Sequence, residues 1–188
     1  MTRIPVIDPK NLTPEQQRVY DAATGLANRA GWLPPPYELS LHCAELTDKW
    51  QQFGELLRYR TSLPRRLSEM AILITARHWS CQYEWYAHEP HARAGGVPEN
   101  VIEAIKLGKR PLFNQPDAEA VYDFVTGIER NHFVSADVHQ RLVNAIGIQG
   151  LVELTALLGH YTLIAMMLNA NEYGVPQGVA PPLPPLPA

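Results

Sequence analysis

The sequence predicts an all-α protein, and three observations support this fold class. Apolar residues recur at spacings of three and four along most of the chain, which is the period of a helix packed on one side. Proline and glycine residues stand between these stretches, at the positions where helices begin and end. We find no sustained alternation of apolar and polar residues, the pattern of a half-buried strand.

The N-terminal region is predicted to be an extended arm followed by a helix. The arm covers residues 1–12, where two prolines oppose a regular helix. The helix starts at Thr13, which has a capping-box partner in Gln16 and a proline between them. We expect this helix to reach Asn28 or Arg29. The same signals predict the later helical ranges, which are 37–59, 64–95, 98–107, 117–129, 135–146 and 151–171.

The composition predicts a single globular domain covering residues 1–188. The formal net charge is -3, so no basic excess favours nucleic acid. The first residues lack the apolar core of a signal peptide, and the two cysteines lie far apart, which predicts reduced thiols and a cytoplasmic location. The apolar range 151–168 approaches the length of a membrane span. Because Glu153, Gly159 and His160 interrupt it, we expect a buried helix and no membrane association.

The C-terminal residues 177–188 form a proline-rich tail, QGVAPPLPPLPA, which predicts extended polyproline II conformation. Two interpretations of this tail remain open. It either stays solvated or lies as an arm across a neighbouring subunit, where Leu183 and Leu186 supply apolar contacts.

Four side chains capable of chemistry fall on one stripe of the predicted central helix. Cys81, Glu84, His88 and His91 lie within an arc of roughly 80° at 100° per residue. Such a stripe supports a thiolate nucleophile, proton transfer between a carboxyl and an imidazole, or metal binding by Glu84 and the two histidines. The alternatives without chemistry are simple packing of Cys81 and a surface pair between Glu84 and His88.

The segment from Arg66 to Ile105 resembles the core of the carboxymuconolactone decarboxylase family, which includes the alkylhydroperoxidase D-type proteins. In that family's peroxidase branch, a glutamate is followed by eleven residues, a Cys-x-x-Cys motif, and a histidine four positions after the second cysteine. Glu69, Cys81 and His88 match the glutamate, the first cysteine and the histidine. Glu84 stands in place of the second cysteine.

The resemblance implies an alkylhydroperoxidase D-like multi-helix bundle that assembles as a homo-oligomer, a trimer or a hexamer. A dithiol cycle needs two cysteines with Cα atoms about 4.4–6.8 Å apart, and the motif lacks its second sulfur. We therefore expect a site without cofactor or metal, in which His88 and Glu84 move protons. Cys81 and Glu69 would tune or orient them, and Glu69 is included on the resemblance alone.

These residues favour a decarboxylase-like enzyme that acts by proton transfer on a small carboxylated or lactone-type organic acid. Two alternatives remain: a single-cysteine thiol-dependent peroxidase, in which Cys81 has a lowered pKa, and a non-catalytic helical oligomer that binds a ligand. Both enzymatic interpretations require the stripe to face a sheltered cavity. Glu69 lies about 18 Å from Cys81 along a straight helix, so it joins the site only if the chain breaks near Arg77 to Ser80.

Overall fold

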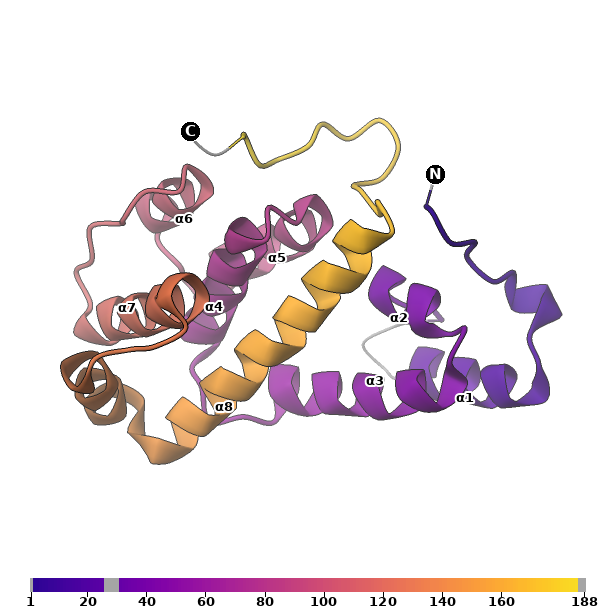
Figure 1. Ribbon diagram of the computed structural model, residues 1–188, viewed down its shortest axis with the longest axis horizontal. Helices are drawn as coiled ribbons and strands as arrows, with labels where there is room; N and C mark the ends of the chain where they lie inside the picture. The colour runs from indigo at the N-terminus through magenta and orange to yellow at the C-terminus, as the bar shows by residue number, and fades with distance from the viewer. Residues whose placement is uncertain (1, 26–30, 186–188) are drawn as a thin grey trace. The chain divides into compact units, whose positions relative to one another are not determined.

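The computed structural model describes residues 2–25 and 31–185, and within these ranges the protein is all-helical (Figure 1). The described residues form eight α-helices and one short 3-10 helix, and they contain no strand. The predicted fold class is therefore confirmed. The chain divides into two compact units, one made of residues 1–60 and 167–173, the other of residues 61–166 and 174–188.

The first unit begins with the predicted arm, which contains one 3-10 turn at Pro9–Asn11, labelled η1. The expectation of an arm without helix is wrong at this turn. Proline is well suited to the first helical position, and the side chain of Asp8 accepts a hydrogen bond from the Lys10 backbone N–H at 2.9 Å. Elsewhere the arm is extended, and the Arg3 backbone N–H donates to the Asn171 carbonyl at 3.0 Å.

Helix α1 (Pro14–Thr24) starts as predicted, with both hydrogen bonds of the Thr13–Gln16 capping box present. Its expected end at Asn28 or Arg29 falls outside the described residues. The range 37–59 is divided into α2 (Pro35–Ser40) and α3 (Ala44–Tyr59). No glycine or proline marks this division in the sequence.

The second unit is built around α4 (Arg65–His78), which packs against α5 (Gln82–Gly95), α6 (Glu99–Lys106) and α7 (Pro116–Asn131). Residues 69–77 of α4 are buried without interruption, so every side of this stretch meets protein. The predicted element 64–95 is thus two helices, α4 and α5. The short helix expected before Gly108 and the helix expected near 117–129 are present as α6 and α7.

The ribbon of α8 (Ala136–Ala170) contains two helical segments that meet at Gly147, as the sequence predicts. Gly147 has φ 73° and ψ 173°, a conformation open almost only to glycine. The Ser135 hydroxyl accepts a hydrogen bond from the Val138 backbone N–H at 3.2 Å and caps the first segment. Among the described residues, α8 is long and apolar enough to cross a membrane, a test that the core helix of a soluble protein also passes.

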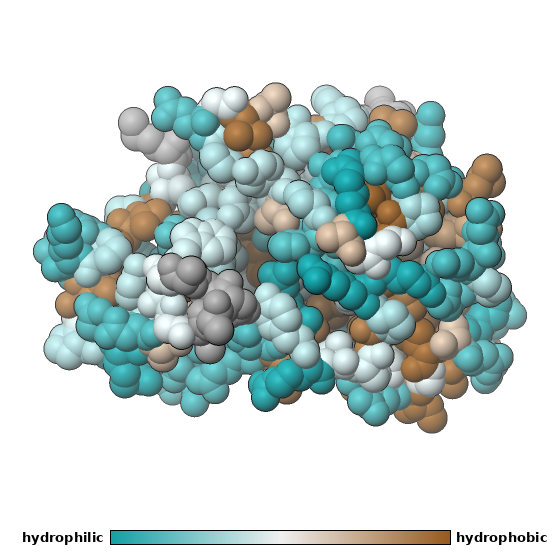
Figure 2. Space-filling view, turned by 180° about the vertical axis from the view of Figure 1, so that it is seen from behind, coloured by the Kyte–Doolittle hydropathy of each residue, from teal (hydrophilic) through white to brown (hydrophobic). Residues whose placement is uncertain are grey.

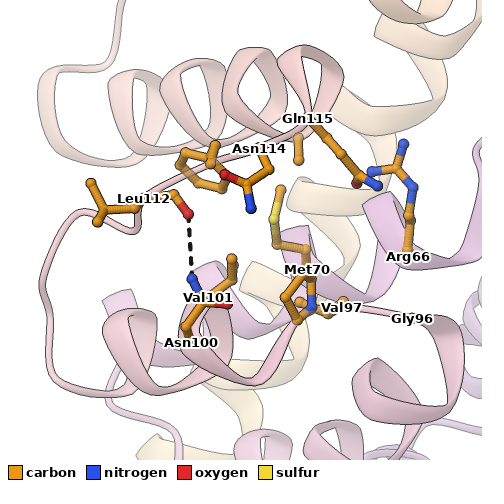
Figure 3. A pocket seen from close by; sticks show the side chains of 12 residues that line it. Arg66, Met70, Gly96, Val97, Asn100, Val101, Leu112, Asn114 and Gln115 are labelled. Atoms are coloured by element: carbon orange, nitrogen blue, oxygen red, sulfur yellow. Dashed lines mark hydrogen bonds between the residues drawn. The ribbon is translucent and has the colours of Figure 1, made fainter.

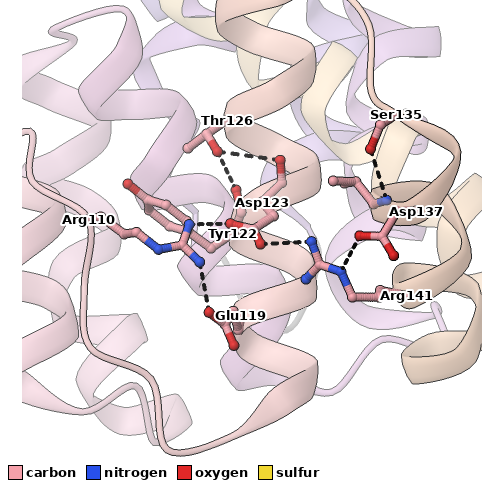
Figure 4. Close-up of polar contacts among 9 residues, drawn as sticks. Arg110, Glu119, Tyr122, Asp123, Thr126, Ser135, Asp137 and Arg141 are labelled. Atoms are coloured by element: carbon pink, nitrogen blue, oxygen red, sulfur yellow. Dashed lines mark hydrogen bonds and ion pairs between the residues drawn. The ribbon is translucent and has the colours of Figure 1, made fainter.

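A polar network joins the loop before α7 to α7 and to the start of α8 (Figure 4). Arg110 forms ion pairs with Glu119 and Asp123 of α7. Arg141 of α8 contacts Asp123 at 3.0 Å and Asp137 at 3.0 Å. These contacts hold the loop 107–115 against the second unit, and this loop forms one wall of the cavity described below.

The proline-rich tail returns to its own chain in the described part, up to residue 185. The Gln82 side chain donates to the Leu183 carbonyl at 3.0 Å and accepts from the Leu183 N–H at 2.9 Å. Arg77 donates to the Pro184 carbonyl at 2.8 Å, and the Leu183 side chain is buried. The interpretation of a solvated tail is therefore wrong at these residues. An arm across a neighbouring subunit stays a prediction, and Leu186 lies outside the described residues.

On the face shown in Figure 2, hydrophilic residues predominate and hydrophobic ones stand in separate groups. Several large apolar side chains of the chain are nevertheless well exposed. Phe133 is 81% exposed, Ile148 is 72% exposed and Val152 is 60% exposed. Ile148 and Val152 are four residues apart on α8 and therefore lie on one side of that helix.

Candidate acid–base site

The site depends on a sharp break between α4 and α5. Ser80 has φ 48°, a left-handed conformation that a helix interior does not allow. The Cys81 backbone N–H donates to the Ala76 carbonyl at 2.8 Å and closes the turn. The break meets the condition stated above for Glu69 to join the site, whereas the prediction of one element over 64–95 is wrong at this point. The chain turns there, so α5 packs along α4 and Glu69 is brought to α5.

His88 lies between two carboxyl groups in the interior of the second unit. Its Nδ1 is hydrogen-bonded to Glu69 Oε2 at 2.8 Å, and its Nε2 is 3.7 Å from Glu84 Oε2. All three residues are 4% exposed. Burying ionisable groups is costly unless they pair with one another, so this array is a stable way to keep an imidazole and two carboxyls away from water.

The local reason for this geometry is different for the two carboxyls. Glu84 and His88 are four residues apart on α5, so the helix itself makes them neighbours. Glu69 is nineteen residues before His88 and reaches it only across the α4–α5 contact. The i,i+4 pair was therefore predictable from spacing, while the Glu69 contact required the turn at Ser80.

Cys81 is the N-cap residue of α5 and is 0% exposed. Burial and, to a smaller extent, the nearby Glu84 carboxyl together raise the pKa of its thiol to about 12, against a smaller lowering by the backbone N–H groups of Glu84 and Tyr83. The thiol is therefore protonated at neutral pH. This direction is opposite to the one that a thiolate nucleophile needs.

Helix α8 contributes two buried aromatic side chains that the sequence analysis missed as site residues. The Tyr161 ring meets the His88 ring edge to face, with centroids 5.0 Å apart and planes at 86°. The His160 ring packs on Tyr161 in the same way at 5.2 Å. Both residues are at most 3% exposed. The sequence did contain a signal for these two site residues. They are polar aromatic residues in an otherwise apolar helix, and such groups need hydrogen-bond partners when they are buried.

Arg65 and His91 border the cluster on the side where side chains reach solvent. Arg65 Nε is 4.0 Å from Glu69 Oε1, and its Nη2 is 3.3 Å from His91 Nδ1. The Arg65 side chain is 59% exposed, while His91 is half-buried with its ring 5.9 Å from the His88 ring. His91 thus lies beside the cluster, as its place on the predicted stripe indicates. Arg65 was not predicted, although it stands four residues before Glu69.

The array can hold and move a proton. When Nδ1 of His88 donates its hydrogen to Glu69, the tautomer and the ring orientation are set, and Nε2 faces Glu84. The 3.7 Å between His88 Nε2 and Glu84 Oε2 is an ion-pair distance, and a proton passes between these two atoms only when that distance shortens to a hydrogen bond. Within residues 2–25 and 31–185, no group of three or more His, Cys, Asp or Glu side chains is arranged to hold a metal ion.

The cluster is packed in the protein interior, while the cavities around α4, α6 and α7 are lined by other side chains. The structure brings Glu84 and His88 to 3.7 Å from each other, and Cys81 stands three residues before Glu84 at the start of the same helix. Their facing a sheltered cavity stays a prediction. Comparison of the chain with protein-family models and with curated protein sequences gives no match.

Proposed function

We propose that the protein is an acid–base enzyme of the carboxymuconolactone decarboxylase type, acting on a small carboxylated or lactone-type organic acid. The observation that supports this proposal is the buried array in which His88 lies between Glu69 and Glu84. Ionisable groups kept in the interior at the cost of desolvation are typical of sites that transfer protons. The motif formed by Glu69, Cys81 and His88 supports the family assignment.

The reaction needs no oxidant and no electron carrier. The bond between the substrate carbon and its carboxylate breaks, carbon dioxide leaves, and the electron pair moves into a conjugated carbonyl group of the substrate. His88, with Glu84 as its proton partner, then delivers a proton to the resulting enolate carbon. Glu69 holds the imidazole in position, and the array recovers its proton from water.

Substrate approaches the array from the side of Arg65 and His91 in this proposal. Arg65 is the cation nearest to Glu69 on the exposed side, and a guanidinium binds a carboxylate through two parallel hydrogen bonds. A movement of this long side chain opens the way toward His88. The opposite side is covered by Tyr161 of α8.

The test is carbon dioxide release from a panel of carboxylated lactones, with His88→Gln as the variant. We expect release by the native protein and a loss of about 100-fold or more in the variant, the usual contribution of a general acid. His139→Gln, at an exposed position of α8, is the matched control and should keep full activity. No release from any lactone, or equal rates for native protein and His88→Gln, would refute the proposal.

A thiol-dependent peroxidase is less well supported, because burial keeps Cys81 protonated. A non-catalytic ligand-binding oligomer is the second candidate, favoured by the interior position of the cluster. It predicts that ligand binding survives His88→Gln and Glu84→Gln unchanged. Assembly into a homo-oligomer is part of both proposals and is supported by the exposed Ile148 and Val152 side chains; sedimentation of the pure protein measures it.

A further inference from the structure

A cavity of about 160 Å³ lies in the second unit at a place that the sequence analysis did not identify (Figure 3). It is a partly open cavity bordered by the start of α4, the α5–α6 connection, the loop before α7 and the first turn of α7. None of Glu69, Cys81, Glu84 and His88 lines it. Its size matches a small ring, since a cavity of about 150 Å³ in another protein interior binds benzene.

The floor of this cavity is apolar. Met70, Val97 and Val101 line it and are buried, with 2%, 6% and 3% of their surfaces exposed. Phe113 and Ala118 continue the apolar lining. In Figure 3 the side chains of Met70 and Val101 point into the space that the loop encloses. A ligand with an apolar body would therefore gain from burial there.

The rim of the cavity is polar, with one cation. Asn100, Asn114 and Gln115 carry amide groups that both donate and accept hydrogen bonds. The Asn100 side-chain amide donates to the Leu112 carbonyl at 3.5 Å (Figure 3). This contact joins the start of α6 to the loop before α7. Arg66 supplies the positive charge. Apolar floor and convergent polar rim together are the usual composition of a small-molecule site.

The backbone adds positive potential at the same rim. Helices α6 and α7 both start beside the cavity, with Pro98 and Gln115 as N-cap residues that make no side-chain hydrogen bond to their helices. At the start of α7 the Asp117 carboxylate accepts a hydrogen bond from the Ala118 N–H at 2.8 Å and offsets part of this potential. The N-terminal end of a helix carries a partial positive charge. Asp117 pairs with Arg66 but does not line the cavity, and a guanidinium has five N–H donors, so it can bind a second anion.

We propose that this cavity binds a small organic acid whose apolar body, about the size of a benzene ring, lies on Met70, Val97 and Val101. Its carboxylate lies at the rim against Arg66 and the amide of Gln115. This inference goes beyond the proposed enzymatic function and does not depend on it, because no proton transfer is involved and the lining shares no residue with the buried array.

The test uses benzoate as the probe and the four methionine methyl groups as NMR reporters in the full chain. Benzoate should shift the Met70 methyl signal and leave those of Met166 and Met167 unchanged. Benzamide, which has the same shape without the charge, should bind at least about fivefold more weakly. A Met70 signal that stays in place at about 10 mM benzoate would overturn the proposal, since that limit excludes even millimolar affinity.

Variants separate the charge from the shape. Arg66→Gln should weaken benzoate binding about tenfold and leave benzamide nearly unaffected, whereas Arg18→Gln, at an exposed arginine paired with Asp48 in the first unit, should change neither. Ala118→Ile should fill the floor and abolish binding of both probes. Equal benzoate affinity in Arg66→Gln and Arg18→Gln would refute the role of Arg66, and unchanged binding in Ala118→Ile would refute the cavity.

A failure of the proposed enzymatic function can be distinguished from a failure of the proposed ligand cavity. Benzoate binding in His88→Gln should equal that of the native protein, even though this variant removes the proposed catalytic group. If Arg66→Gln does not fold, Ala118→Ile and the comparison of benzoate with benzamide on native protein still decide the question. A loss of benzoate binding in folded His88→Gln would contradict the separation of the two sites.

Discussion

The buried array around His88 and the cavity beside Arg66 are opposite kinds of site within one unit. The array holds three ionisable groups in the interior, with Glu69 hydrogen-bonded to His88 and Glu84 at an ion-pair distance from it. The cavity has room for a ligand, an apolar floor and a single cation at its rim. Helix α4 contributes Glu69 to the array and Arg66 and Met70 to the cavity. At 100° per residue, the helix face of Arg66 and Met70 lies roughly 80° around the axis from Glu69.

The difference shows that the ionisable side chains of the array and the space for a ligand lie at separate places in this chain. A carboxyl buried without water must be paired, and in the array both carboxyls face the same imidazole. The cavity is formed where three helix starts and a loop meet, and there no carboxyl lines the wall. The experiments below test this contrast, from the largest expected effect to the smallest.

The largest effect is expected for alkylation of Cys81. With a pKa of about 12, its thiolate fraction at pH 8 is about 10⁻⁴, against about a quarter for an ordinary thiol of pKa ~8.5. In a Cys43→Ser variant, iodoacetamide should therefore modify Cys81 at least about 10³-fold more slowly in native protein than in urea. The measurement is the rate of mass increase. Comparable rates in the two conditions would place Cys81 in an open site and contradict the contrast.

Removal of the Glu69 carboxyl should strongly destabilise the fold. Glu69→Ala leaves the buried His88 without its hydrogen-bond partner, and breaking a buried pair costs about 3 kcal/mol. Glu69→Gln keeps an acceptor oxygen and should cost less. Urea unfolding measures both. Glu119→Gln, which removes an exposed partner of Arg110, is the control and should change the free energy of unfolding by about 0.5 kcal/mol or less. A similar small value for Glu69→Ala would show that the array is not tightly coupled.

Glu129 of α7 is a carboxyl in a third kind of environment, in which desolvation is the largest influence on its pKa. Burial raises its pKa to about 7, and Thr75 and Arg130 lower it by less. The native state keeps this proton up to about pH 7, whereas the unfolded chain loses it near pH 4.5. The free energy of unfolding therefore falls as the pH rises between these values, by up to about 3 kcal/mol at 1.36 kcal/mol per pKa unit.

Glu129→Gln removes this titration. The variant should be more stable than the native protein at pH 8 and nearly equal to it at pH 4, where Glu129 is protonated in both states. Urea unfolding at the two pH values measures the difference. A stability difference that is the same at pH 4 and pH 8 would contradict the raised pKa of Glu129.

The smallest effect is expected at the rim of the cavity. Leu112 is 85% exposed, so Leu112→Ser should change the free energy of unfolding by less than about 0.5 kcal/mol. Thermal unfolding measures this. A larger loss would show that the loop is held by apolar contacts of Leu112, and the rim would then belong to the core.

Much of the helical organisation could be predicted from local signals. The Thr13 capping box, the Ser135 cap and the break at Gly147 are all present. Two errors share one physical cause. The separation of α2 from α3 and the turn at Ser80 occur at residues without glycine or proline, so no local helix breaker in the sequence marks either of them.

The sequence by itself determined the helices and the Glu84–His88 pair, because contacts four residues apart follow from the helix period alone. The tertiary structure decided that Glu69 completes the array, that Tyr161 covers it and that Cys81 is buried and protonated. It also decided that a cavity opens beside Arg66. These features join segments far apart in the chain, so they depend on how α4 turns into α5 and how the other helices pack against α4, which no local spacing encodes.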